Sequence, residues 1–380
     1  MKLFECDACG QPLYFENTSC ESCRRRLGFV SERQDLGPLD PDGPGWRLHA
    51  EPARSVVFCA NAQHHACNWL LPEDDPGPYC AACRHNRVVP DLTSQSNLER
   101  WRRLETAKRR LFYTLLKLRL PLAARPGDPE GLAFDFLSDE APAAPKVMTG
   151  HDNGLITINI IEADDAERER VRSQMGEPYR TLLGHMRHEV GHYFWNVLIR
   201  DGGRLDGFRA VFGDEREDYG AALQRHYAEG PPPDWQERFV SSYASAHPWE
   251  DFAETWAHYL HMVDTLETAN AFGVRVRPKV SRGPELASSV EFDPHDTADL
   301  DRLVSAWLPL TFAVNSLNRS MGQPDLYPFV LTPTVVGKLS FIHDSIYRAT
   351  GRNAEVHADE DMLTAVAASL RSPVATPSAV

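Results

Sequence analysis

The most informative stretch of this chain reads Leu182-Leu183-Gly184-His185-Met186-Arg187-His188-Glu189-Val190-Gly191-His192-Tyr193-Phe194-Trp195. Within it, His188, Glu189 and His192 form an H-E-x-x-H motif. In an α-helix, at about 100° and ~1.5 Å per residue, the two histidines lie one above the other, roughly 6 Å apart along one face. They can therefore share one tetrahedral metal ion, and Glu189 projects beside them.

This arrangement suits a hydrolytic zinc site. Neutral imidazoles hold Zn²⁺, the metal lowers the pKa of a bound water toward about 7, and an adjacent carboxylate accepts the proton as the water attacks a carbonyl. We therefore expect His188 and His192 to be metal ligands and Glu189 to be the general base. The alternative is a pair of core histidines, but the helix predicted from Pro178 to Arg200 has an apolar side, where unpaired polar groups are costly and a metal supplies a partner.

A third protein ligand must come from elsewhere. In a metzincin the motif would continue with glycine at position 195 and histidine at position 198, but these positions hold Trp195 and Leu198, which excludes that class. The other arrangement uses a glutamate on a second helix, followed one turn later by an acidic residue that orients a ligating histidine. Residues 243–261 fit it, because Glu250 and Glu254 follow a helix-starting proline at i, i+4 spacing.

All eight cysteines lie before residue 84, in two groups of four. The first group, two C-x-x-C pairs at zinc-ribbon spacing, comprises Cys6, Cys9, Cys20 and Cys23, and the second, with one such pair, comprises Cys59, Cys67, Cys80 and Cys83. Because the N-terminus does not read as a signal peptide, we expect a cytoplasmic protein, in which paired C-x-x-C units favour metal over disulfides. The cysteines predict two closed structural Zn²⁺ sites, with His64 or His65 as substitute ligands at the second.

Together these motifs resemble a gluzincin metallopeptidase. They are more closely similar to a bacterial family of zinc-binding metallopeptidases whose members join an N-terminal zinc-ribbon region to an H-E-x-x-H domain. The resemblance covers most of residues 1 to about 345 and implies a peptidase fold, with Glu250 as the third zinc ligand and Glu254 as the carboxylate that orients a ligating histidine. Asp251 and Glu254 remain alternative ligands, and we favour Glu250 because it alone leaves a carboxylate one turn later.

Hydrolysis also needs a hydrogen-bond donor for the oxyanion that forms when water adds to a carbonyl. Tyr243 resembles the tyrosine that some gluzincins place over the zinc, and His247 is a nearer competitor. Either residue could instead pack before the helix. We interpret His185 as a supporting or structural residue, and His258 and His261 as packing residues.

The predicted fold class is α+β. Residues 1–95 form a β-rich double zinc-ribbon region, and residues 96–370 form a mostly helical gluzincin-like metallopeptidase domain with a small sheet, followed by a disordered tail at 371–380. The domain begins with a basic helix at 96–120, with a net charge of +6, whose apolar side is expected to pack while its basic side is solvated. The 57 residues between His192 and Glu250 predict an inserted helix or loop.

Two strands are predicted near 132–136 and 155–160, the second after an Asp-Asn-Gly turn. In this class of peptidase a sheet edge beside the active helix pairs with extended substrate, because peptide main chain can add as a strand. We expect the 155–160 strand, or its hairpin partner near 147–149, to serve in this way. A purely structural sheet is the alternative.

Charge and hydropathy restrict the function further. The chain has a net charge of −14, and residues 1–95 carry −4, which argues against nucleic acid as a partner. No stretch approaches the roughly 18 apolar residues of a membrane span. The leading prediction is a zinc metallopeptidase with one catalytic and two structural Zn²⁺, acting on a peptide or protein substrate. The alternative is a catalytically silent zinc-bearing interaction module that recruits protein partners through its ribbons, although such a protein has no chemical need for Glu189.

Overall fold

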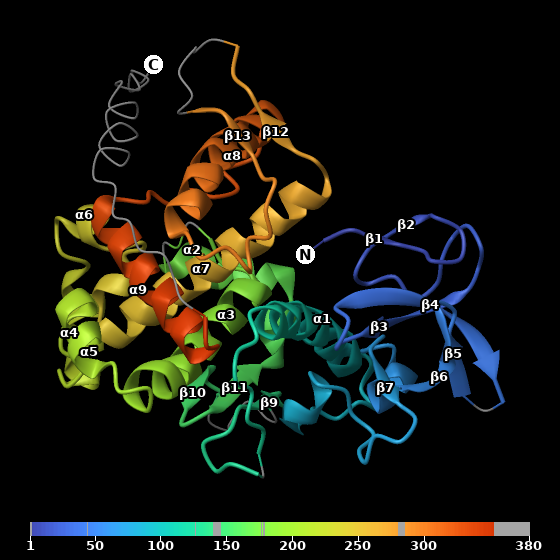
Figure 1. The fold of residues 1–380 in the computed structure, drawn as a ribbon. Coiled ribbons are helices and arrows are strands. Elements are labelled where there is room, and N and C mark those ends of the chain that lie inside the picture. The colour runs from blue at the N-terminus through green and yellow to red at the C-terminus, as the bar shows by residue number, and fades with distance from the viewer. Residues whose placement is uncertain are drawn as a thin grey trace.

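The computed structural model describes residues 2–43, 45–125, 127–139, 146–175, 177, 179–279 and 286–352. The tail predicted at 371–380 and Pro178, the predicted start of the motif helix, lie outside these residues. A β-rich N-terminal region lies on one side and a helical body on the other, with helix α1 (Gln95–Lys117) between them (Figure 1). This confirms the predicted α+β class, with the β-rich region ahead of a mostly helical domain.

Short strands build the N-terminal region. A hairpin of β1 (Phe4–Glu5) and β2 (Pro12–Leu13) precedes an antiparallel five-stranded sheet in sequence order, which consists of β3 (Arg26–Val30), β4 (Asp35–Asp42), β5 (Gly45–Leu48), β6 (Glu51–Phe58) and β7 (Leu70–Pro72). The 3₁₀ turn η1 (Ala60–His64) lies between β6 and β7, and a second 3₁₀ turn, η2 (Cys83–His85), follows β7. The core of this region is aromatic: the rings of Phe29 and Trp69 lie 4.7 Å apart, and the ring of Phe15 lies 5.5 Å from that of Tyr113 on α1. The region therefore shares its core with α1.

The basic side of α1 differs from the prediction, because most of it is not solvated. Arg100 pairs with Asp164 in the helical body, while Arg110 pairs with Glu16 in the N-terminal region. Lys108 is completely buried. The reason is the position of α1 between two parts of the molecule, where its long cationic side chains reach carboxylates on both sides. The periodicity of the sequence identifies the apolar side of a helix, but it does not show what packs against the opposite, polar side.

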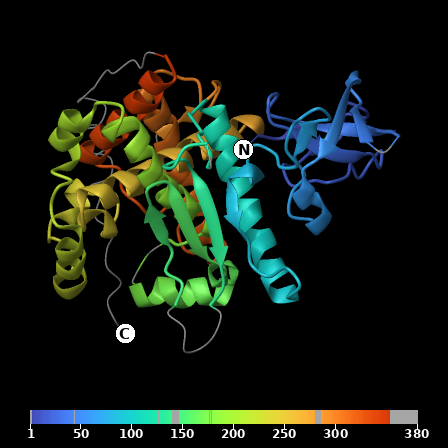
Figure 2. The ribbon, with the colours of Figure 1, turned by 90° about the horizontal axis from the view of Figure 1, so that it is seen from below.

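A four-stranded sheet lies beside α1 (Figure 2). Its order is β10 (Gly150–Asp152), β11 (Leu155–Asn159), β9 (Ala133–Leu137) and β8 (Asn86–Val88). Strand β11 pairs with β9 in parallel and with β10 in antiparallel orientation, so β11 is an interior strand and β10 is an edge. The hairpin between them turns at Asn153 and Gly154, both at positive φ, as a two-residue turn requires.

The helical body contains α2 (Asp165–Met175), α3 (Leu182–Phe194), α4 (Leu205–Phe212), α5 (Tyr219–Glu229), α6 (Trp235–Arg238), α7 (Pro248–Ala271), α8 (Leu300–Ser320) and α9 (Pro333–Ala349). The shorter elements are η3 (Ile160–Ala163), η5 (Tyr243–Ser245) and a small hairpin of β12 (Arg275–Val276) and β13 (Ser288–Ser289). Helices α4 to α6 occupy the long spacer between the motif and α7. Among the described residues, none of the helices is long and apolar enough to cross a bilayer.

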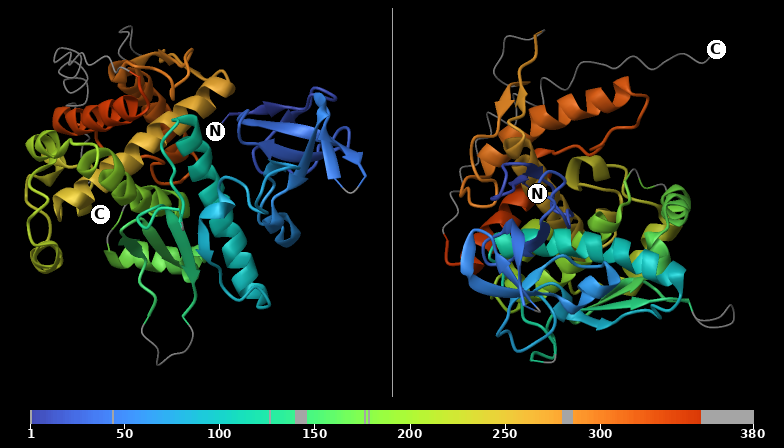
Figure 3. Two further views of the ribbon diagram at one scale, coloured as in Figure 1. Left: turned by 60° about the horizontal axis from the view of Figure 1, so that its bottom comes forward. Right: turned by 90° about the vertical axis from the view of Figure 1, so that its right-hand side faces the viewer.

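Helix α3 carries the H-E-x-x-H motif and begins at Leu182, later than predicted, because the Thr181 hydroxyl caps it by accepting a hydrogen bond from the Gly184 amide at 3.0 Å. Its last turn widens into a π-helical segment at Trp195–Arg200. Helix α3 packs on α7, which in turn contacts α8 and α9 (Figure 3). The contact is close at Gly191, where a side-chain Cβ would lie 3.0 Å from Ala253 Cα.

Candidate metal centre

Three side chains converge between α3 and α7. The Nε2 atoms of His188 and His192 lie 3.0 and 3.7 Å from Glu250 Oε2, and all three atoms lie within 4.8 Å of one another. Zinc bonds of about 2.0–2.1 Å in a tetrahedron separate neighbouring ligand atoms by about 3.3 Å, so this spacing suits zinc. Glu250 Oε2 is buried and makes no hydrogen bond to any described residue. A buried carboxylate oxygen facing two imidazole nitrogens fits a bound cation.

Neighbouring side chains orient these ligands. Glu254 Oε1 lies 2.7 Å from His188 Nδ1, and Ser241 donates a hydrogen bond of 2.6 Å to Glu254 Oε2. A proton on His188 Nδ1 leaves its Nε2 lone pair facing the centre. The Tyr219 hydroxyl donates at 2.7 Å to Glu250 Oε1, which leaves Oε2 for the metal.

Glu189 lies next to the ligand group and contacts His185. The distance from His185 Nε2 to Glu189 Oε1 is 3.2 Å, and His185 Nδ1 lies 2.6 Å from Glu162 Oε2. Burial alone would raise the pKa of Glu189, but the hydrogen bond from His185 and the nearby imidazoles outweigh it and lower that pKa. Glu189 is therefore a carboxylate at neutral pH, the form that a base requires.

Two cavities meet at this centre. The first, of about 330 Å³, is lined by the three ligand residues together with Thr149, Gly150, His151, Asp152, Asn153, Glu189, Asn196, Tyr219, Tyr243 and Trp249. The second, of about 510 Å³, also contacts His188, Glu189 and Tyr243 and extends past α2 to His258 and His261. Residues 149–153, which include the edge strand β10, thus border the metal cavity.

Of the two predicted oxyanion donors, the structure brings only Tyr243 to the cavity, where its ring centroid lies 5.9 Å from that of His188. His247 caps α7 instead: its Nδ1 accepts a hydrogen bond from the Trp249 amide at 3.1 Å, and its Nε2 lies 3.2 Å from the Glu217 carbonyl oxygen. With both ring nitrogens engaged by backbone, the expectation that His247 could supply the donor is not met.

The alternative ligand Asp251 also points elsewhere. Its carboxylate forms a buried ion pair of 2.6 Å with Lys338 on α9. His258 Nδ1 lies 2.7 Å from the Tyr327 hydroxyl, and His261 contacts Arg187. These two histidines therefore line the second cavity and do not join the ligand group.

Sequence reasoning missed Tyr219 and His151. Tyr219 contacts the third ligand, and the His151 ring stacks on that of His192 with centroids 5.8 Å apart. Tyr219 lies in the spacer before α7, where no motif marks it. His151 follows the predicted edge segment 147–149, so the strand-edge argument could have located it.

The eight cysteines are free and form the two predicted groups. In the first, Sγ–Sγ distances are 3.8 Å between Cys6 and Cys23 and 3.6 Å between Cys9 and Cys20. Tetrahedral zinc with bonds of about 2.3 Å to sulfur places neighbouring sulfurs about 3.8 Å apart. The second group is wholly buried, with Cys67 and Cys80 Sγ atoms 3.7 Å apart. It is complete without His64 or His65.

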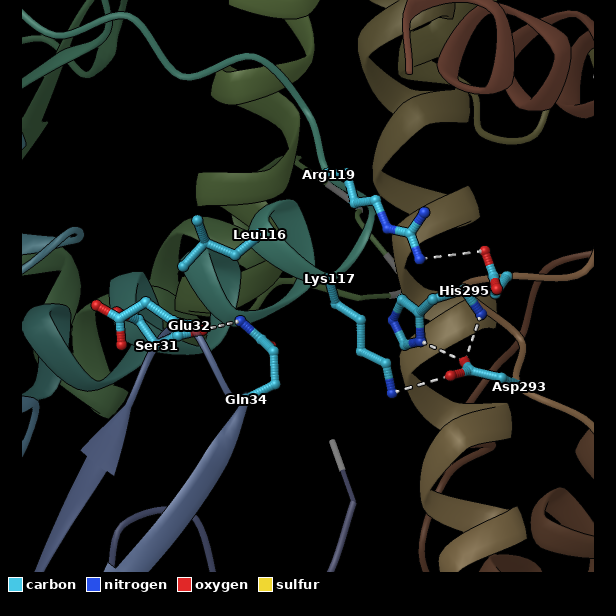
Figure 4. Close-up of a pocket in the computed structure, with 9 residues that line it drawn as sticks. Ser31, Glu32, Gln34, Leu116, Lys117, Arg119, Asp293 and His295 are labelled. Atoms are coloured by element: carbon cyan, nitrogen blue, oxygen red, sulfur yellow. Dashed lines mark hydrogen bonds and ion pairs between the residues drawn. The ribbon is translucent and has the colours of Figure 1, made fainter. Parts of the chain in front are cut away.

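A further buried group comprises Asp264, Glu267 and His295. This group contains its own cations, because Arg187 pairs with Asp264, and Lys117 pairs with Glu267. Lys117 also lies 3.3 Å from Asp293, which neighbours His295 (Figure 4). Since side-chain cations balance these carboxylates, we interpret the group as an ion-pair network at the end of α1.

Comparison with known proteins identifies the family of the chain. Residues 97–345 match the family described as "Putative zinc-binding metallo-peptidase", and residues 3–94 match a zinc-ribbon domain. Proteins of Mycobacterium bovis and Mycobacterium tuberculosis, each described as uncharacterized, are 44% identical over 345 residues, which covers 90% of this chain and 94% of the relative. No solved structure matches the chain. The chain therefore belongs to this zinc-binding metallopeptidase family and carries a zinc-ribbon domain ahead of its H-E-x-x-H domain.

Proposed function

We propose that this chain is a zinc-dependent peptidase of the gluzincin type. His188, His192 and Glu250 hold the catalytic Zn²⁺, and Glu189 is the general base. The observation that carries the proposal is the spacing of the three ligand atoms around a buried carboxylate oxygen without a hydrogen bond to any described residue, with the Glu189 side chain beside them. When bound, Zn²⁺ would act as a Lewis acid and lower the pKa of a coordinated water.

The protein residues then have distinct roles. Glu189 accepts the water proton and can return it to the leaving amine, and Glu254 holds the tautomer of His188. Tyr243 donates to the oxyanion; burial and the charge of Glu250 raise the pKa of its hydroxyl, so it keeps its proton at neutral pH.

The substrate is an extended peptide lying along β10. Since β11 is interior, the predicted 155–160 strand cannot be the edge; the edge strand beside the metal cavity is β10 at Gly150–Asp152, which directly follows the predicted hairpin-partner segment 147–149. An added strand would hydrogen-bond to this edge and place its side chains alternately into and away from the two cavities that meet at Glu189.

The first test is metal content. With one open site and two four-thiolate sites, the purified protein should contain about three zinc ions per chain. The double variant His188→Ala, His192→Ala should contain about two, by elemental mass spectrometry of protein freed of loose metal. An unchanged count would show that these histidines are not ligands.

The second test separates an enzyme from a silent interaction module. Glu189→Gln keeps the shape of the side chain but cannot accept the proton, so it should retain three zinc ions and lose at least a hundredfold in turnover. The readout is cleavage of fluorescein-labelled casein and of mixed synthetic decapeptides. Equal turnover by wild type and Glu189→Gln would remove Glu189 from the mechanism. Absence of cleavage by the fully zinc-loaded wild type would favour the interaction module.

A further inference from the structure

His185 lies one helical turn before His188 and bridges two carboxylates. Its Nδ1 lies 2.6 Å from Glu162 Oε2 and its Nε2 lies 3.2 Å from Glu189 Oε1. Both contacts are largely shielded: the side chains of His185, Glu162 and Glu189 are 20%, 15% and 7% exposed. The ring therefore uses both of its nitrogens, one on each carboxylate.

The bridge is fixed to the sheet as well as to α3. The Thr149 hydroxyl donates to Glu162 Oε1 and accepts a hydrogen bond of 3.1 Å from the backbone N–H of Asn159. Thr149 therefore connects Glu162 to β11 and to the segment that precedes β10. Glu162 itself belongs to η3, which follows β11 directly. Three separate elements thus fix the position of the imidazole.

We propose that His185, held by Glu162, is a positioning residue for the general base Glu189. This inference rests on the proposed function. A free glutamate side chain has three rotatable bonds, and restricting it to one orientation requires a fixed donor. His185 supplies that donor to Oε1 of Glu189, whose side chain lines both cavities at the centre. Burial opposes a charge on His185, but the two carboxylates outweigh it and raise its pKa to about 9, so both ring nitrogens carry protons at neutral pH.

The contacts distinguish this role from simple packing. A histidine that only filled space would not need a carboxylate on each nitrogen, nor would Glu162 need hydrogen bonds to both Thr149 and His185. Burial alone would raise the pKa of Glu162, but His185 and Thr149 lower it to about 2. The resulting carboxylate–imidazolium–carboxylate row ends at the base and at no metal ligand.

The test measures binding of acetohydroxamate to the zinc-loaded, full-length protein by calorimetry, and so requires no substrate. A hydroxamate coordinates zinc and transfers its proton to the neighbouring base, so its affinity reports the position of Glu189. His185→Gln should weaken binding about tenfold, as is usual when a residue that orients an active group is replaced. Glu162→Gln keeps the shape of the side chain and should weaken binding less. The zinc content should remain at the wild-type value in both.

The decisive comparison is a double-mutant cycle. If His185 acts through Glu189, then His185→Gln should have almost no effect on acetohydroxamate affinity in a Glu189→Gln background. Equal losses in both backgrounds, or no loss in the single variant, would overturn the inference while leaving the proposed function intact. If acetohydroxamate does not bind the wild type, or if Glu189→Gln alone leaves its affinity unchanged, the proposed function fails and this inference fails with it.

His49→Gln is the matched control. His49 also forms a histidine–carboxylate pair through its Nδ1, which lies 2.7 Å from Asp40 Oδ2, but it lies in the turn after β5 in the N-terminal region. This variant should bind acetohydroxamate as the wild type does. Thermal unfolding of each variant shows whether weaker acetohydroxamate binding results from loss of the fold.

Discussion

At the scale of single residues, the candidate centre depends on side chains that hold other side chains. Glu250 offers one oxygen to the two histidines and the other to the Tyr219 hydroxyl. A carboxylate with both oxygens free can bind a metal in several orientations, whereas one held by a donor presents a single oxygen. Metal affinity should therefore depend on Tyr219, although it is not itself a ligand.

Tyr219→Phe tests this dependence. The ring remains and only the hydroxyl is lost, so the fold should be unchanged while zinc affinity falls about tenfold, the lower end of the range for partners of metal ligands. The measurement is the zinc dissociation constant by competition with a chelating dye. Tyr227→Phe, on the same helix and 62% exposed as a residue, is the control and should match the wild type in zinc affinity. A zinc affinity that does not change in Tyr219→Phe would show that Glu250 is held by its own helix.

The residues that sequence could identify are those with a fixed spacing. His188, Glu189 and His192 follow from the period of one helix, and Glu250 with Glu254 from the same period on another. Tyr219 could not be found in this way, because its distance from Glu250 is set by how α5 folds back on α7. His247 was considered for a catalytic role because it is close in sequence, but the first turn of α7 takes up both of its ring nitrogens.

At the scale of elements, the centre requires α3 and α7 to lie unusually close. Gly191 makes this approach possible, because any larger residue would place its Cβ 3.0 Å from Ala253 Cα and 3.2 Å from Trp256 Cδ1. The neighbouring atom in α7 is backbone, which cannot move without shifting the whole helix. The glycine inside the motif is thus a packing requirement and not a weak point of α3.

Gly191→Ala should therefore destabilise the protein although alanine is the better helix former. Alanine gains about 1 kcal/mol in helix propensity, but overpacking against a helix backbone costs typically 1–3 kcal/mol, and the shift of α7 also moves Glu250 away from the histidines. Urea unfolding should show a net loss of stability, together with weaker zinc binding. Gly337→Ala is the control: Gly337 lies inside α9 with open space around it, so the same substitution should stabilise by about 0.5–1 kcal/mol. A stabilised Gly191→Ala protein would show that the helices are free to separate.

The elements themselves were largely predictable, but their surroundings were not. Hydrophobic period and motif spacing predicted α3 and α7, and short runs of β-branched and aromatic residues predicted the two inner strands. The same reasoning predicted a solvated basic side for α1, which is wrong because that side contacts the N-terminal region and η3. When a helix packs on both sides, its sequence shows an apolar stripe only on the side that makes hydrophobic contacts. A side that packs through ion pairs looks like a solvent-exposed side.

At the scale of the whole molecule, α1 joins the zinc-ribbon region to the peptidase body. The wholly buried second cysteine group touches it directly, since Cys83 Sγ lies 3.6 Å from Glu105 Oε2. Glu105 pairs with Lys108 at 2.7 Å, and both side chains are completely buried. A closed site of four thiolates and one Zn²⁺ carries a charge of −2, so the single positive charge of Lys108 offsets part of the negative charge on the thiolates and Glu105.

Lys108→Met should consequently weaken the whole molecule and not only the ribbon. Removing one partner of a buried pair leaves an uncompensated charge and costs about 3–5 kcal/mol. Burial already raises the pKa of Glu105 to about 7, so protonation of Glu105 relieves part of this cost near neutral pH. Because α1 contributes to the core on both sides, urea unfolding followed by tryptophan fluorescence should show one transition at lower urea concentration, with loss of zinc from the second cysteine group. Arg119→Met, two residues beyond the end of α1 and with 65% of its side chain exposed, is the control and should change the unfolding free energy by less than about 0.5 kcal/mol. The double variant Lys108→Met, Glu105→Gln should recover most of the loss.

If Lys108→Met instead unfolded the ribbon in a separate early transition while the peptidase body kept its stability, the two regions would be independent units, and α1 would belong to only one of them.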